Sequence, residues 1–585
     1  MKKRGNVNTR VPDDECASTG EEVKKGSTRR QFLGQVSVAA AGAAGVLTMP
    51  SVATAQQSPE TAASMTPVAV PPGVTNNRVI EAFVLRVGEA TADALVPPAR
   101  NVNNGDDARY PDKGGTYTKA LPHDSFGRVD LTAYAAFKKA LASGKFSDYA
   151  AIPKGGTATQ NGPQGALAFD LEALDSIQFG QPQVPPAPPI AGDVTATELL
   201  EHYWCSLLRD VNFTDYGTSP LAIQAAELSS LPSYLGPRDG NGHVTTDLLF
   251  RGGFPGETTG PYLSQFFVLP TFLGAQPVSQ QMRSFMPNQD FMTDFNEWLN
   301  VQNGVDTGRR LQFDPQLRFR RNGRDLAAFT HVDVLYQAYF TALLVLGTIG
   351  APVNPGNPYI GSNQNGFGTF GGPDFAGTMA EVATKALNAV WWQKWNVHLR
   401  PRPEVTGGQV HLVKTGHGDK TDVQPSNVVL NSIGLQQSFN KYGTWLLSQA
   451  FPEGSPTHPS YPTGHGTVGG ACLTVLKFFF DGNFPVLNPM VPSSDGLSLE
   501  PFSGPGANQL TVNGELNKLG HNVSFGHGIH SGIHWRSDTE TSLMLGEAVA
   551  LSFLRNRAKI YNEPFSVTIQ KFDGTSATIS NHGNP

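Results

Sequence analysis

The sequence is poor in charge and in cysteine. Only 16% of its 585 residues are charged, and the formal net charge is −6. Because it has no basic tract and no arginine- and lysine-rich patch, nucleic acid is excluded as a partner. The three cysteines are Cys16, Cys205 and Cys472. The first lies in a segment expected to be removed and the others lie in apolar helical patterns, which excludes a disulfide framework and predicts buried free thiols.

Long apolar runs are also missing. A membrane-spanning helix needs about 18 uninterrupted apolar residues, and the run from Val36 to about Leu47 is too short and too rich in glycine. This run follows Ser27-Thr-Arg-Arg-Gln-Phe-Leu33 and precedes Ala53-Thr-Ala55, a pattern typical of a twin-arginine signal peptide. Residues 1–55 are therefore predicted to direct export of the folded protein to the periplasm or the exterior, with no membrane span in the mature form.

Alternating, strand-like patterns are scarce, whereas apolar residues recur at helical spacing. After a disordered lead-in over 56–73, a single all-α domain is predicted over 74–585, with long loops that hold many of the 63 glycines and 44 prolines. The segment 327–347 is apolar on most faces and is expected to be one buried central helix. The other main helices are predicted at 78–94, 131–143, 195–211, 220–231, 290–302, 377–391, 431–449, 467–480, 515–524 and from about 534 to 554.

A rigid turn occurs in the C-terminal half, at Ser455-Pro-Thr-His-Pro-Ser-Tyr-Pro-Thr-Gly-His-Gly-Thr467. Its prolines and glycines predict a fixed loop that leads into a helix, whose first N–H groups have no acceptor within the helix. A helix N-terminus binds phosphate-like anions, and His465 adds a group that titrates near neutrality. By itself the stretch fits an ordinary turn with two incidental histidines equally well.

Two further segments carry cations and imidazoles. One is Trp391-Trp-Gln-Lys-Trp-Asn-Val-His-Leu-Arg-Pro-Arg-Pro403, and the other is His521-Asn-Val-Ser-Phe-Gly-His-Gly-Ile-His-Ser-Gly-Ile-His-Trp-Arg-Ser-Asp538. With the turn, these segments resemble the three-part signature of vanadium-dependent haloperoxidases, which acid phosphatases of the phosphatidic acid phosphatase type 2 superfamily share. The matching residues are Lys394, Arg402, Pro403, Thr463, Gly464, His465, His534 and Asp538.

The resemblance extends over about 78–554 and is closest to the algal-type bromoperoxidases, as in Gly366-Phe-Gly-Thr-Phe-Gly-Gly-Pro373. It implies two four-helix bundles, a site in the C-terminal half (about 320–560), and a homodimer or higher homo-oligomer. The implied cofactor is vanadate. The implied substrates are hydrogen peroxide, bromide or iodide, and a small organic acceptor that a hypohalous-acid-like oxidant would halogenate.

The resemblance also implies a role for each cationic residue. His534 would bind vanadium, with Asp538 one helical turn later to fix its tautomer. Arg402 would offer a planar fork to two oxygens of the anion, and Lys394 would be a point charge that polarises a bound oxygen. Arg400 is expected to be a surface residue.

The central turn would supply the remaining contacts. Thr463 and Gly464 would give a hydroxyl and a backbone N–H to the anion, and His465 would be the acid–base residue. His458 matches a histidine of the bromoperoxidase branch, which favours bromide or iodide. A purely structural hydrogen bond is nearly as good an explanation for His458 as tuning of the halide step.

One element of the signature is missing. The family carries an arginine six residues before the ligand histidine, a position that is Gly528 here, or His527 if one residue is inserted. Arg536 lies about 200° around a helix from His534 at roughly 100° per residue, so it is a poor substitute. We therefore expect protonated His527 to replace part of the charge, so that vanadate affinity weakens as pH rises through neutrality. His521 and His530 are expected to be supporting or surface residues.

Two other functions fit the same residues. An acid phosphatase would use His534 as its nucleophile and His465 as its general acid. A degenerate relative would bind an oxyanion, or serve as a structural envelope protein, without turnover. The long algal-type N-terminal half favours the peroxidase.

Overall fold

The computed structural model describes residues 78–179 and 184–581. The predicted signal peptide and lead-in lie outside these residues. Helices dominate the described part, and none of them is long and apolar enough to cross a membrane. They are α2 (Arg78–Leu95), α3 (Asp106–Arg109), α4 (Leu131–Ser143), α5 (Phe146–Ala150), α6 (Asp193–Leu208), α7 (Pro220–Gln224), α8 (Phe295–Gln302), α9 (Gly323–His331), α10 (Gln337–Thr348), α11 (Gly372–Trp392), α12 (Pro403–Lys414), α13 (Asn427–Leu430), α14 (Ile433–Tyr442), α15 (Gly464–Phe479), α16 (Val512–Phe525) and α17 (Arg536–Ala558).

Strands are few and short. Within the described ranges they pair as two-stranded antiparallel sheets and form no larger sheet. The prediction of an all-α protein is confirmed, while its division into two four-helix bundles stays a prediction. The pairs are β1 (Thr271–Leu273) with β2 (Gln276–Val278), β3 (Met282–Phe285) with β4 (Phe313–Arg318), β5 (Met490–Pro492) with β6 (Leu499–Pro501), and β7 (Ser566–Gln570) with β8 (Ser576–Ser580).

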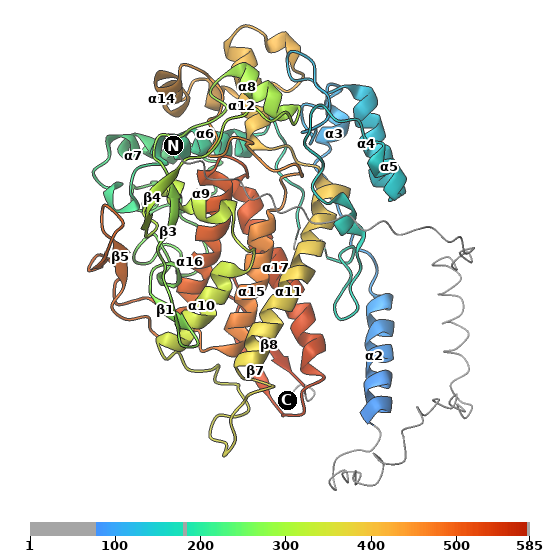
Figure 1. Cartoon of the computed structure of the whole chain (residues 1–585), viewed down its shortest axis with the longest axis vertical. Helices are drawn as coiled ribbons and strands as arrows, with labels where there is room; N and C mark the ends of the chain where they lie inside the picture. Colours follow the sequence, from blue (N-terminus) through green and yellow to red (C-terminus); the bar gives the residue numbers. More distant parts are fainter. Residues whose placement is uncertain (1–77, 180–183, 582–585) are drawn as a thin grey trace, which may run out of the picture. The chain divides into compact units, whose positions relative to one another are not determined.

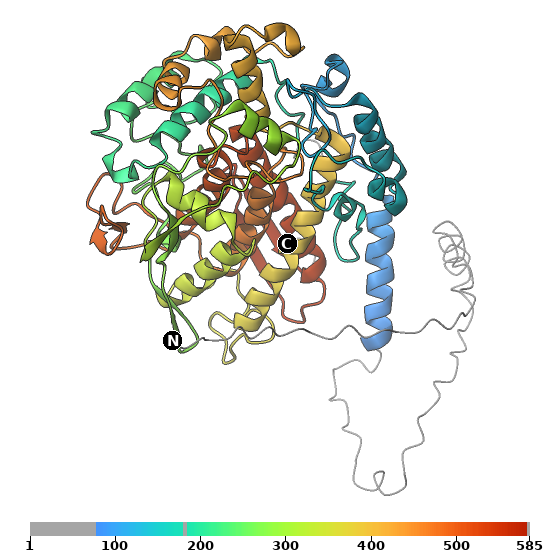
Figure 2. The same ribbon diagram turned by 45° about the horizontal axis from the view of Figure 1, so that its top comes forward.

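Helix α15 lies at the centre of the core. It contacts α10, α11, α16 and α17 (Figure 1), and every residue from Gly464 to Phe479 is buried. The turned view keeps α11, α15 and α17 side by side (Figure 2). Cys472, on α15, and Cys205, on α6, are buried free thiols as predicted.

Glycines let α15 and α17 approach at backbone distance. A Cβ atom added to Gly470 would lie 2.0 Å from the Leu543 carbonyl oxygen, and one added to Gly546 would lie 2.0 Å from the Thr467 oxygen. The Thr463 N–H donates to the Asp538 carbonyl oxygen at 3.3 Å, one end of the same contact. The two helices therefore run parallel, and their N-termini, with the partial positive charge of each helix dipole, lie together.

The predicted helix over 327–347 is wrong as a single element. The structure breaks it into α9 and α10, with residues 332–336 between them. Val332 is 73% exposed and Val334 is 57% exposed, so the apolar composition of this segment did not indicate burial here. The break instead directs Asp333 toward His465, whose ring nitrogen Nε2 lies 2.9 Å from a carboxylate oxygen of Asp333.

Most other helices lie within a few residues of their predicted bounds. The segment 131–143 is helical as predicted, with the Asp130 carboxylate accepting from the Ala133 N–H as an N-cap. Helix α11 begins five residues earlier than predicted, with Pro373 in its first turn. Helix α14 is shorter than the predicted 431–449 because Gly443 ends it with a left-handed backbone conformation, φ 69°.

Candidate active site

The three predicted segments converge in the core. The rings of His465 and His527 stack with centroids 3.8 Å apart, and the rings of His527 and His534 are 5.7 Å apart. Lys394 and Arg402 are fully buried at 0% exposure. Residues separated by up to 140 positions in the chain therefore face one small volume, at the paired N-termini of α15 and α17.

His534 is held in one tautomer. Its Nδ1 lies 2.9 Å from the Asp538 carboxylate, and its Nε2 lies 2.8 Å from Nη1 of Arg402. A carboxylate only accepts hydrogen bonds and a guanidinium only donates them, so Nδ1 carries the proton and Nε2 presents a lone pair. This is the state in which a histidine binds a metal, with a carboxylate behind it.

Arg400 is a buried residue, contrary to the prediction of a surface position. It is 2% exposed, and its guanidinium joins Asp538 at 2.7 Å to Glu198 of α6 at 3.0 Å. Asp538 would otherwise be a buried carboxylate with only neutral partners beside His534. Its partner cation therefore comes from Arg400, whereas Arg402 makes its contacts with His458 and His534.

Lys394 lies in a π-helical turn, η5 (Gln393–His398), that continues α11. Its ammonium donates to the carbonyl oxygens of Pro459 at 3.0 Å and Ser460 at 2.6 Å. Burial, and then the charge of Arg402, lowers the pKa of Lys394 well below its usual value. These bonds fix the ammonium against the loop that carries His458.

Arg402 and His458 form one unit. The guanidinium donates from Nε to the His458 carbonyl oxygen at 3.0 Å and from Nη2 to its Nδ1 at 2.9 Å. Burial lowers the pKa of Arg402 to about 10, so it remains a cation at neutral pH. The His458 ring packs against Trp391, with centroids 4.8 Å apart. His458 is therefore both a wall of the site and a positioning partner of the arginine.

The structure decides between Gly528 and His527. Residues Gly526–His530 form a π-helical turn, η7, which accommodates one more residue than an α-helical turn. A Cβ atom added to Gly528 would lie 2.8 Å from the Cβ of His534, so no side chain fits there. His527 is the residue that faces the site. Burial, and then the neighbouring His465, lowers the pKa of His527 well below its usual value in the ligand-free protein.

Sequence reasoning missed two side chains that contact the histidines. Asp333 bonds His465, as described above, and Ser460 donates from Oγ to the Asp538 carboxylate while lying 3.2 Å from Nδ1 of His534. Ser460 lies inside the predicted turn, so its position was a usable signal. Asp333 comes from a separate segment with no motif around it, so no sequence pattern indicated this contact.

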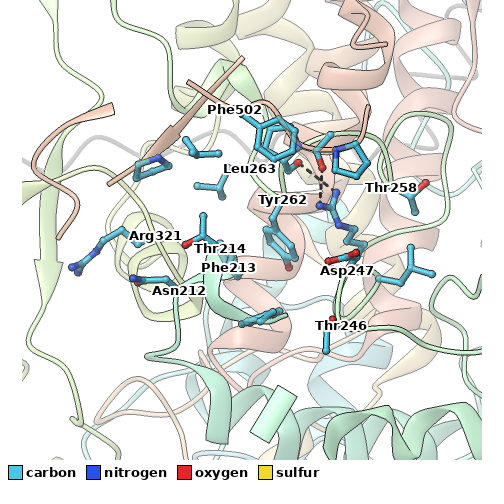
Figure 3. Close-up of a pocket in the computed structure, with 18 of the residues that line it drawn as sticks. Asn212, Phe213, Thr214, Thr246, Asp247, Thr258, Tyr262, Leu263, Arg321 and Phe502 are labelled. Carbon is cyan, nitrogen blue, oxygen red and sulfur yellow. Dashed lines mark hydrogen bonds between the residues drawn. The ribbon is translucent and has the colours of Figure 1, made fainter. Parts of the chain in front are cut away.

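Arg536, His521 and His530, the other basic residues of the third segment, bond to residues outside the anion site. Arg536 pairs with Glu201 at 2.5 Å, away from the cavity as predicted, and His521 lies 2.9 Å from the Phe250 carbonyl oxygen. His530, at the end of η7, lies 3.1 Å from the hydroxyl oxygen of Tyr262. Tyr262 stacks on Phe213, with centroids 3.8 Å apart, in a separate cavity of about 240 Å³ (Figure 3).

The donor set fits a phosphate-like oxyanion. Lys394 and Arg402 supply two cations, and the first turn of α15 supplies N–H groups that have no acceptor within the helix. Among the described residues, no group bonds Oγ1 of Thr463 or Nδ1 of His527, although both atoms are buried. Buried polar atoms in proteins are normally hydrogen-bonded, and an oxyanion bound at the first turn of α15 would supply partners for these two.

Fold and site thus define a helical protein with a buried cationic oxyanion pocket and an imidazole that can bind a metal. A vanadium-dependent bromoperoxidase of Ascophyllum nodosum is 35% identical over 529 residues, which is 86% of this chain and 92% of that one. Those of Corallina officinalis and Corallina pilulifera are 32% and 31% identical, over 87% of this chain and 100% of each of theirs.

Comparison with solved structures agrees with this comparison of sequences. A homohexameric vanadate-dependent bromoperoxidase from Ascophyllum nodosum matches with a TM-score of 0.81 at 28% identity, covering 89% of this chain and 96% of that one. No family model matches the chain. The relatives' identity and coverage nevertheless show that the chain belongs to the vanadium-dependent bromoperoxidase family.

Proposed function

We propose that the protein is a vanadate-dependent haloperoxidase that oxidises bromide or iodide with hydrogen peroxide to a hypohalous-acid-like oxidant. The observation that carries the proposal is the Nε2 lone pair of His534, held beside two buried cations and a helix N-terminus. Bound vanadate would supply Lewis acidity toward hydrogen peroxide. The protein's part is to bind the anion, to exclude water and to move protons.

Each residue has a role set by its contacts. His534 would be the metal ligand, with Asp538 behind it, and Arg402 and Lys394 would neutralise the anion's oxygens. Lys394 would also polarise an oxygen at the reacting face. Gly464 would add a backbone N–H from the first turn of α15.

His465 would be the acid–base residue. Because Asp333 accepts from its Nε2–H at 2.9 Å, the neutral ring has its lone pair at Nδ1 and can take a proton there. His458 would act with Arg402, through their bond of 2.9 Å, and would tune the halide step.

One assay pair tests the function. With vanadate, hydrogen peroxide and bromide, the protein is expected to brominate a phenol dye, and omission of vanadate or of bromide should abolish the reaction. Hydrolysis of an aryl phosphate without peroxide would identify the phosphatase instead. Vanadate binding without either activity would identify a non-catalytic oxyanion binder.

Thr463 provides a first quantitative test. Its hydroxyl makes no capping bond to α15, so Thr463→Val should leave stability nearly unchanged. If the hydroxyl bonds a charged oxyanion, vanadate affinity should fall about tenfold or more, because such bonds contribute roughly 1.5–3 kcal/mol. Equilibrium dialysis measures the affinity. Thr474→Val is the control, since Oγ1 of Thr474 bonds the Gly470 carbonyl oxygen at 2.7 Å within α15; an equal loss in both variants would contradict the role.

His527 provides a second test. Its pKa is lowered in the free protein, whereas a bound anion favours the protonated ring, so binding should take up a proton and affinity should fall as pH rises. His527→Arg fixes the charge and should bind vanadate more tightly, with a flatter pH dependence. The measurement is the vanadate dissociation constant between about pH 6 and 9. A wild-type affinity that is flat with pH and unchanged in His527→Ala would contradict the role.

Two further proposals concern the whole protein. We propose that residues 1–55 direct export in folded form, which rests on the paired Arg29 and Arg30 before an apolar run.

We also propose a single haloperoxidase domain over 74–585 that assembles as a homo-oligomer. The homohexameric relative supports the assembly. Light scattering on the purified mature chain measures its mass directly.

A further inference from the structure

A cavity of about 690 Å³ is lined by residues that are the chain neighbours of His458 and Asp333. One wall is the loop 455–457, which is followed directly by His458. Another wall includes Val332, whose neighbour Asp333 bonds His465. Small-molecule pockets typically have volumes of roughly 300–1,000 Å³. The cavity is therefore large enough for an organic ligand, and two separate chain segments connect it to the histidines.

Hydrogen bonds hold the walls of this cavity in place. Nζ of Lys119 donates to the Ser455 carbonyl oxygen at 2.6 Å. Oγ1 of Thr457 donates to the Thr159 carbonyl oxygen at 2.6 Å, and the Asn161 N–H donates to the Thr457 oxygen at 2.8 Å. A ligand would thus enter a preformed pocket and would not have to order it, which lowers the entropic cost of binding.

Each lysine and arginine that lines the cavity is already paired with a carboxylate. An anionic ligand would have to displace a carboxylate from one of these cations, which costs part of its binding energy. The cavity therefore does not favour an anionic ligand. The pairs are Lys119 with Glu404 at 2.6 Å, Arg309 with Glu297 at 2.7 Å, and Arg310 with Asp306 at 2.8 Å.

The rest of the lining is largely apolar. Val332 is 73% exposed and Val305 is 38% exposed, and Leu311, Phe313 and Pro452 line the same cavity. Covering apolar surface with an apolar ligand is favourable by about 25 cal/mol per Å². An apolar ligand that covers Val332 and Val305, the two exposed valines of the lining, gains this energy.

We propose that this cavity binds the organic acceptor of the halogenation and that the acceptor is an uncharged, largely apolar molecule such as an alkoxyarene. The reaction, though not the binding, rests on the proposed function. In that reaction the O–Br bond of hypobromous acid breaks, a C–Br bond forms at a ring carbon, the ring loses its proton, and water leaves. Bound in a cavity whose lining residues Thr457 and Val332 directly precede His458 and Asp333 in the chain, the acceptor would meet oxidant that leaves the site.

Direct binding tests the proposal without turnover. The probe is 1-methoxynaphthalene, measured by equilibrium dialysis against wild type, Val332→Trp and Val305→Asp. Filling or charging the cavity should raise the dissociation constant at least about tenfold. Leu487→Trp is the matched control, because Leu487 is 66% exposed and lies outside the cavity lining; its dissociation constant should stay within about twofold. Naphthalene-1-sulfonate should bind at least about tenfold more weakly to wild type.

Turnover separates this proposal from the function itself. Tribromide formation from bromide and peroxide, without an organic acceptor, should be unchanged in Val332→Trp, whereas KM for 1-methoxynaphthalene should rise. Equal dissociation constants in wild type and both cavity variants, or equal binding of the sulfonate, would overturn the proposal. A wild-type protein that forms no tribromide would instead overturn the proposed function, and the dialysis result would still decide whether the cavity binds the probe.

Discussion

Replacing His534 by alanine is expected to abolish vanadate binding and halide oxidation while the protein stays folded. The imidazole supplies the Nε2 lone pair that lies 2.8 Å from Nη1 of Arg402. Loss of a group that merely orients a metal ligand costs roughly 10- to 100-fold in metal affinity, so loss of the ligand itself should cost more. Equilibrium dialysis with metal analysis gives the affinity, and circular dichroism checks the fold.

Two further variants test whether the loss of vanadate affinity is specific to His534. Asp538→Asn keeps the shape behind His534 but removes the charge, so its loss of affinity should fall in that smaller range. His521→Ala removes another buried imidazole, one that lies against the Phe250 carbonyl oxygen, and should leave vanadate affinity unchanged. If His534→Ala still binds vanadate like wild type, the anion is held elsewhere and the assignment of the site fails.

Replacing Arg400 by alanine is expected to reduce the free energy of unfolding by about 3–5 kcal/mol, because it leaves two buried carboxylates without their cation. Arg400 bridges Asp538 and Glu198 at 2.7 and 3.0 Å, and all three side chains are almost fully buried. Denaturant unfolding followed by circular dichroism measures the loss. Vanadate affinity should also fall, because Asp538 would no longer be fixed behind His534.

Two controls make this result specific. Arg400→Lys should be intermediate, since an ammonium lacks the planar fork that spans two carboxylates. Arg310→Ala removes an arginine from an exposed pair with Asp306 and should change stability little, because water solvates both partners. An Arg400→Ala protein as stable as wild type would show that the buried pairs contribute nothing net.

The parts of the site that lie close together in sequence could be predicted. Lys394, Arg402 and His465 carry their chemistry in short motifs, and the structure brings them together with His534. The environment of Arg400 could not be predicted, because Glu198 comes from a helix about 200 positions away and no local pattern links the two. Sequence spacing alone does not show which way the side chains of Arg400 and Arg402 point. In the structure, Arg400 points toward Asp538 and Glu198, whereas Arg402, two residues later, points toward His458 and His534.

The fold shows the same limit. Apolar periodicity predicted α4 and α11 well, because one face of each packs on the core. It failed over 327–347, where Val332 and Val334 are apolar but exposed, between two helices. Periodicity measures which residues are apolar, whereas the break places Asp333 in a bond of 2.9 Å with His465, which lies 132 positions away in the chain. Such a bond can be seen only once the chain has folded.

The π-helical turn η7 holds one residue more than an α-helical turn, so counting residues along the chain does not tell which side chain faces the site. By widening one turn, the backbone changes which residue meets the cavity, while α16 before it and α17 after it remain continuous helices. Counting six places back from His534 selects Gly528, whereas following the backbone selects His527. A local change in helix type can thus change which side chain, and so which charge, faces the site, while α16 and α17 stay unchanged.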